Sequence, residues 1–94
     1  MVISNRYEPQ YDKLHPYYQL YTLLNTERGT VPLKRGMGLD PRMIDKPITI
    51  IQGGIEADIQ GQIDKYINGL RLVGVRVTPT SNGLEIICEV ELDG

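Results

Sequence analysis

The sequence predicts a small single α+β domain, with helices packed on a small antiparallel sheet that ends in a C-terminal β-hairpin. The chain has 94 residues, which is enough for one small domain. Isoleucine recurs every four residues between Ile51 and Ile67, and this spacing predicts an amphipathic helix. Apolar and polar residues alternate between Leu70 and Leu92, which predicts two strands. Helices and a short antiparallel sheet of this size are expected to share one core.

Residues 1–14 show no sustained hydrophobic period, and we expect them to form an extended N-terminal arm ahead of a domain over residues 15–94. Five of the six tyrosines fall between Tyr7 and Tyr21. Tyrosine offers apolar area with a polar tip, so Tyr7 and Tyr11 are candidates for contact with a partner. The alternative is that the arm packs on its own domain.

His15-Pro16 marks the start of the first helix, because proline suits the first helical turn. We expect this helix to end near Thr26, since Gly29 follows shortly afterwards. Its apolar stripe is formed by Tyr17, Leu20, Tyr21, Leu23 and Leu24.

The segment between Thr30 and Leu39 is expected to be a strand or an extended loop, with tight backbone geometry at Gly36-Met37-Gly38. Asp40-Pro41 suggests a short helix that ends near Asp45. After Pro47, Thr49 and Gln52 have the spacing of a capping box at the start of the isoleucine helix. Asn68-Gly69 provides its stop.

The C-terminal hairpin is expected to join strands over 70–78 and 84–92 through a turn at 79–83. In the first strand, Val73, Val75 and Val77 are expected on one face. The final strand places a second apolar series on one face: Leu84, Ile86, Cys88, Val90 and Leu92. An unprotected edge on this strand would accept a strand from another chain. The alternative is that the chain's own arm covers that edge.

The composition narrows the classes of function. A formal net charge of −2 argues against general nucleic-acid binding, although seven basic and five acidic residues in 1–47 contrast with three and seven in 48–94. No apolar stretch is long enough for a membrane span. The single cysteine, Cys88, excludes an internal disulfide and a multi-cysteine zinc site, and it favours a reducing cytoplasmic setting. We interpret Cys88 as a core residue. We expect no cofactor and no metal.

The sequence offers little for catalysis. His15, the only histidine, has no nearby Ser, Cys or Asp that completes a nucleophile set. A glycosidase needs two carboxylates across a sugar site, and no spacing among the twelve acids selects such a pair, with Glu27 only a first candidate. We therefore assign no catalytic residue. Four basic residues form a modest patch that suits an acidic protein partner: Arg28, Lys34, Arg35 and Arg42.

Several short motifs occur in a specific order: residues 23–33 (LLNTERGTVPL), then Arg35, residues 37–40 (MGLD) and residues 44–47 (IDKP). In this order the chain resembles the gene 25-like baseplate wedge family of contractile phage tails, from about Tyr18 to Leu92. Two positions differ from the family pattern. The Glu-Pro-Arg step before the hairpin is Gly69-Leu70-Arg71 here, so only Arg71 carries over, and Met37 stands where the family often has Phe.

The resemblance implies a structural component that joins the inner baseplate to the sheath and initiates the sheath by receiving its strands. The implied partners are the tail sheath protein, other wedge proteins and a tail tube or hub protein, with multiple copies in a sixfold baseplate of a virion assembled in the host cytoplasm. Two other functions remain open, a peptidoglycan-cleaving lysozyme-like enzyme and a small cytoplasmic adaptor. The residues expected to contact partners are Arg71, Arg35, Leu84, Ile86, Cys88, Val90, Leu92, Tyr7 and Tyr11.

Overall fold

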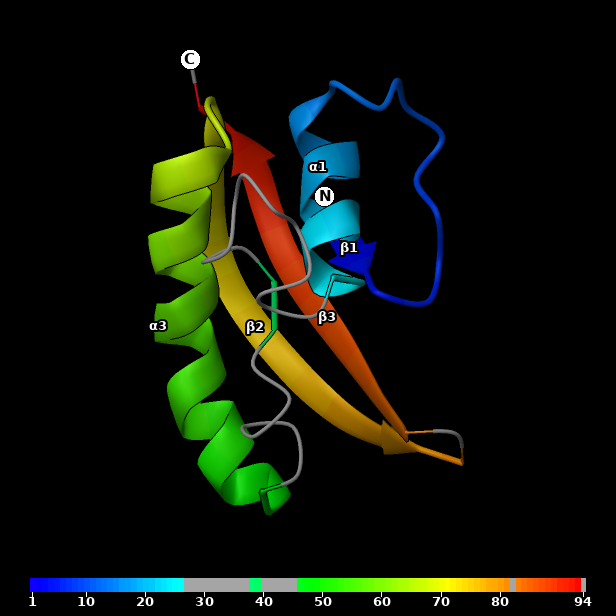
Figure 1. Ribbon diagram of the computed structural model, residues 1–94, viewed down its shortest axis with the longest axis vertical. Helices are drawn as coiled ribbons and strands as arrows, with labels where there is room; N and C mark the ends of the chain where they lie inside the picture. Colours follow the sequence, from blue (N-terminus) through cyan, green and yellow to red (C-terminus); the bar gives the residue numbers. More distant parts are fainter. Residues whose placement is uncertain (27–37, 40–45, 82, 94) are drawn as a thin grey trace.

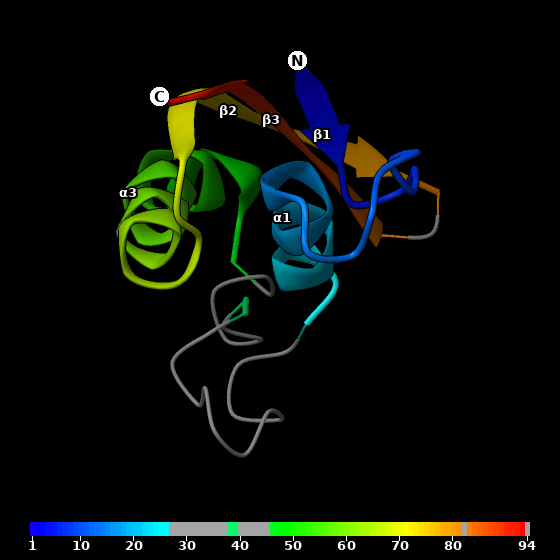
Figure 2. The ribbon, with the colours of Figure 1, turned by 90° about the horizontal axis from the view of Figure 1, so that it is seen from above.

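The computed structural model describes residues 1–26, 38–39, 46–81 and 83–93, and within these it confirms the predicted α+β class. Two helices lie side by side on one face of a three-stranded antiparallel sheet, and the opposite face carries no helix in the described part of the chain (Figure 2). The elements in chain order are β1 (Val2–Ser4), α1 (Pro16–Leu24), α3 (Ile48–Tyr66), β2 (Leu70–Thr80) and β3 (Gly83–Leu92).

The order of the strands is β1-β3-β2, so the C-terminal strand lies in the middle of the sheet (Figure 1). The expectation of an open edge on this strand is therefore wrong. Val2, Ile3 and Ser4 pair with Glu89, Cys88 and Ile87 in antiparallel register. The physical reason is that the N-terminal segment supplies the missing ladder, which is the alternative in which the arm covers its own domain.

Helix α1 begins where the sequence predicts, and its end lies two residues before the expected one. The His15 side chain caps the start, because its Nδ1 accepts a hydrogen bond from the Tyr17 backbone N–H at 3.1 Å. Pro16 occupies the first turn, where its missing N–H leaves no bond unmade. Leu20 and Leu23 are fully buried against the sheet side of the core.

The isoleucine stripe of α3 faces the core as predicted, but the prediction of a capping box at Thr49 and Gln52 is wrong. The N-cap is Pro47, which has no side-chain cap bond, so Thr49 already lies inside the first turn. A capping box needs its Thr at the N-cap position itself. The helix ends before Gly69, whose φ of 80° is accessible to glycine at little cost. The buried stripe is Ile51, Ile55, Ile59, Ile63 and Ile67.

Strand β2 contains a β-bulge that the alternation pattern did not reveal. Leu72 pairs with Val90 and Gly74 pairs with Glu89, so Val73 is an extra residue. The bulge moves the core-facing series from Leu72 before it to Val77 after it, and Val73 turns outward with 53% of its surface exposed. The prediction that Val73 shares a face with Val77 is therefore wrong. The turn is also shorter than expected, because Thr80 still pairs with Gly83.

The extended segment expected after Thr30 and the short helix expected near 40–45 fall on residues outside the described ranges, apart from Gly38 and Leu39. The tight geometry expected at Gly38 is confirmed by its φ of 109°. The buried Gln62 side chain holds this glycine through two bonds. Its Oε1 accepts from the Gly38 N–H at 2.6 Å, and its Nε2 donates to the Gly38 carbonyl at 2.9 Å.

Candidate interaction surface at the sheet edges

The edge of β3 that faces β1 is covered by a short strand and by the residues on either side of it. The three paired residues of β1 lie opposite residues 87–89 of β3, which itself has ten residues. Beyond this pairing, the Met1 carbonyl accepts from the Val90 N–H at 2.8 Å, and the Asn5 N–H donates to the Ile86 carbonyl at 3.2 Å. Backbone groups of β3 therefore point towards β1 along most of the strand.

The side chain of Asn5 continues this cover with two further bonds. Its Nδ2 donates to the Leu84 carbonyl at 3.1 Å, and its Oδ1 accepts from the Ile86 N–H at 2.9 Å. A carboxamide carries one donor group and one acceptor, so it satisfies an extended backbone as another peptide unit would. Asn5 thus protects the stretch of β3 that β1 is too short to reach.

Besides its backbone ladder and the bonds of Met1 and Asn5, strand β1 is held by one buried apolar side chain and one polar contact. Ile3 is buried in the core with 2% of its surface exposed, whereas Val2 points outward and is 58% exposed. The Ser4 hydroxyl donates to Glu85 Oε2 at 2.9 Å. A three-residue strand with a single buried aliphatic group has few contacts to lose when it leaves the sheet.

The opposite edge, formed by β2, is blocked by a side chain from α3. Gln52 Nε2 donates to the Val75 carbonyl at 2.9 Å, and its Oε1 accepts from the Val77 N–H at 2.9 Å. These are the outward-facing backbone groups that an added strand would need. Pro79, two residues further in the same alternation, has no N–H to offer. Together with the bulge, these features protect the β2 edge from strand addition.

Replacing Gln52 with alanine should open the β2 edge at little cost to the core. We expect the free energy of unfolding to fall by about 1 kcal/mol, because the Val75 and Val77 backbone groups exchange the carboxamide for water. Amide exchange at Val77 should become faster. The matched control is Gln60→Ala on the same helix, where the lost side-chain bond is to Asp64 alone. Unchanged protection of the Val77 amide would contradict the assigned role of Gln52.

The structure places the partner-contact residues expected on β3 in two environments. The side chains of Ile86, Cys88 and Val90 lie in the core, and they are at most 1% exposed. Leu84 is half-buried and Leu92 is 52% exposed near the end of β3. These side chains are therefore not brought together on an open edge, because β1 covers it.

Arg71 lies on the outward face of β2 and forms an ion pair with Glu91 on β3. Both side chains are well exposed, so this pair contributes about 0–1 kcal/mol to stability. Arg35 lies outside the described residues, as do Glu27 and the rest of the basic patch. The guanidinium of Arg71 remains accessible to solvent.

Two tyrosines and His15 form a cluster of rings at the start of α1. The Tyr11 ring lies 4.5 Å from the His15 ring and 5.1 Å from the Tyr17 ring, measured between centroids. Tyr11 is therefore partly committed to its own domain, although 41% of it is exposed. Tyr7 is 68% exposed and remains available for contact.

Chemical groups suited to catalysis are scarce among the described residues. Burial raises the pKa of the Cys88 thiol from its ordinary 9.0 to about 12, so it stays protonated and unreactive at neutral pH. His15 uses its Nδ1 as a helix cap. In the described ranges, no group of three or more His, Cys, Asp and Glu side chains is placed to hold a metal ion. Within the same ranges, no helix has the length and apolarity to cross a membrane.

Comparisons with protein-family models, curated proteins and solved structures find no significant match for this chain. The residues that decide which sheet edge is accessible are Ile3, Asn5 and Gln52, and sequence reasoning missed all three. Their signal was weak. An apolar residue in an aperiodic arm and two isolated amides have no distinctive spacing.

Proposed function

We propose that this chain is a non-enzymatic structural component of a contractile phage tail baseplate that initiates sheath assembly through strand pairing. The proposal rests on the ordered family motifs in the sequence, and one geometric observation favours it. The ten-residue strand β3 directs a row of backbone groups at an edge where a three-residue strand is its only strand partner in the described chain.

The acceptor for a sheath strand is the side of β3 that β1 now occupies. The hydrogen bonds at this edge involve the backbone groups of Leu84, Ile86 and Val90, and the register places Cys88 in the same series. These residues contribute to the interface through their main chain, while the side chains of Ile86, Cys88 and Val90 stay in the core. A longer incoming strand would replace β1 and pair along more of β3 than β1 does.

The vacated site defines the chemistry of the incoming strand. One position must carry an aliphatic side chain, because the pocket now filled by Ile3 is lined by the hydrophobic core. The next position favours a hydroxyl, which would replace the Ser4 bond to Glu85. The β2 edge is not the acceptor in this proposal, since Gln52 and Pro79 block it.

Arg71 is proposed to contact a carboxylate of another wedge protein. Its guanidinium is exposed beside Glu91, and arginine suits bidentate contacts with carboxylates. Arg71→Ala should reduce co-purification of the wedge partners at least tenfold, while the free energy of unfolding changes by about 1 kcal/mol or less. Glu91→Gln is the matched control, because it removes the same intramolecular pair and keeps the arginine. Equal partner recovery from Arg71→Ala and wild type would remove Arg71 from the interface.

The experiment that tests the proposal uses tail tubes on baseplates assembled with or without this chain, mixed with a contractile-tail sheath subunit. We expect ordered sheath only when the chain is present. The purified chain should not clear a peptidoglycan suspension. Two results would contradict the proposed function. The first is clearing of the peptidoglycan suspension by the chain, with loss of this activity when one carboxylate is replaced. The second is normal sheath assembly without the chain.

A further inference from the structure

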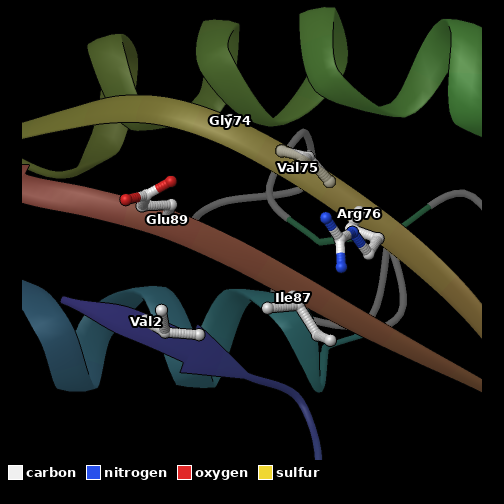
Figure 3. A pocket seen from close by; sticks show the side chains of 6 residues that line it. All are labelled: Val2, Gly74, Val75, Arg76, Ile87 and Glu89. Carbon is white, nitrogen blue, oxygen red and sulfur yellow. The ribbon is translucent and has the colours of Figure 1, made fainter.

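The outward face of the sheet carries a hollow on the side opposite the helices. The hollow has a volume of about 330 Å³ and lies between β2, β3 and β1 (Figure 3). Its floor is Gly74, at the bulge of β2, and the surrounding side chains include Val2, Arg76, Ile87 and Glu89. The helices lie on the other face of the sheet, so no described element covers these residues.

The hollow extends over Gly74, which has no side chain. A Cβ added at this position would meet no atom within 4 Å, so the space above the residue is empty. Arg76 and Glu89 are both exposed, and among the described residues neither forms an ion pair. A surface with a hollow, an apolar centre at Ile87 and one unpaired charge of each sign is suited to a partner with the reverse arrangement.

A second copy of the same surface supplies that arrangement. On β2, Gly74 and Arg76 are two residues apart, and they pair with Glu89 and Ile87 on β3. Consider a two-fold axis that lies in the plane of the interface, runs perpendicular to the strands and passes between these two pairs. This axis places Arg76 of one copy opposite Gly74 of the other. Each Arg76 then enters the opposite hollow beside the opposite Glu89, and this contact occurs twice.

We propose that this chain forms a symmetric dimer through the outward face of its sheet, with reciprocal Arg76–Glu89 pairs and the Gly74 hollow as the receptor. The sheet is narrow, and the covered area is on the order of 500 Å² per copy from strand dimensions. This is below the roughly 800 Å² per partner of a standard interface, so we expect a weak dimer that forms only at high protein concentration. The inference does not depend on the proposed role in a baseplate.

Sedimentation equilibrium of the purified chain from about 10 µM to 1 mM tests the dimer. We expect the average mass to rise towards that of two chains at the upper concentrations. Arg76→Glu and Glu89→Arg should each remain monomeric, because each places like charges together twice. An equimolar mixture of the two variants should associate again, since every contact is then between opposite charges. Gly74→Leu should weaken association at least tenfold by filling the hollow.

Lys65→Glu is the matched control for Arg76→Glu, because it makes the same change of charge on the helical layer and should leave association unchanged. Circular dichroism establishes that each variant is folded. Folding is expected because the side chains of Arg76, Glu89 and Lys65 are exposed, and because a Cβ at Gly74 would meet no atom within 4 Å. A wild-type mass that stays monomeric at 1 mM overturns the proposal. Undiminished association of Arg76→Glu, or a mixture of variants that fails to associate, overturns it as well.

Discussion

Replacing Ile59 with alanine should lower the free energy of unfolding by about 3 kcal/mol. Ile59 is fully buried in the middle of the α3 stripe, where the helix packs on the sheet. Truncation removes three carbons from the core and leaves a cavity that the neighbouring isoleucines cannot fill. In a domain of this size, such a loss is a large share of the total stability. Urea unfolding followed by circular dichroism measures it.

Ile50→Ala is the matched control, because Ile50 lies on the same helix and is 54% exposed. We expect this variant to change the free energy of unfolding by no more than about 0.5 kcal/mol. Similar losses for the two variants would mean that the isoleucine stripe does not form the core.

Replacing Ile3 with alanine should favour opening of β1 from the sheet while the rest of the domain stays folded. The change removes the buried aliphatic group of β1, at a cost of about 2 kcal/mol. Because 1.4 kcal/mol corresponds to a factor of ten, the open form should become about 30-fold more populated. Amide exchange at Ile86 and Val90 should accelerate by this factor, since these N–H groups donate to Asn5 and Met1.

Val2→Ala provides the comparison, because Val2 is on the same strand but points outward. Its effect on exchange at Val90 should be less than about twofold. If Ile3→Ala accelerates exchange equally at all core amides, β1 opens only with the whole domain. That result would remove the physical basis for strand exchange.

Periodicity was sufficient to predict the helices and the hairpin. The four-residue spacing from Ile51 to Ile67 specifies one buried face of a helix, and the alternation from Leu84 to Leu92 specifies a strand. Proline after His15 placed the start of α1 because it acts within a single turn. These features depend on residues close together in the sequence, so the spacing of apolar residues and prolines is enough to predict them.

The sheet edges could not be predicted because they depend on contacts between distant residues. Asn5 meets β3 about eighty positions away, and Gln52 meets β2 across 23 to 25 positions. Nothing local distinguishes these amides from solvated ones. The bulge at Val73 was missed for another reason. Val73 continues the two-residue spacing of Val75 and Val77, so the sequence does not show that it is the extra residue.

Locking β1 in place tests strand exchange most directly. Val2 and Glu89 are opposite each other at a non-hydrogen-bonded position, where Cα atoms lie about 4.5 Å apart and a disulfide fits. Val2→Cys and Glu89→Cys, made together in a Cys88→Ala background, allow one protein to be compared oxidised and reduced. Sheath nucleation on baseplates is measured in both states, with the wild-type chain under the same oxidant as control. We predict nucleation by the reduced form and its loss on oxidation; equal nucleation in both states would contradict the exchange of β1 for a sheath strand.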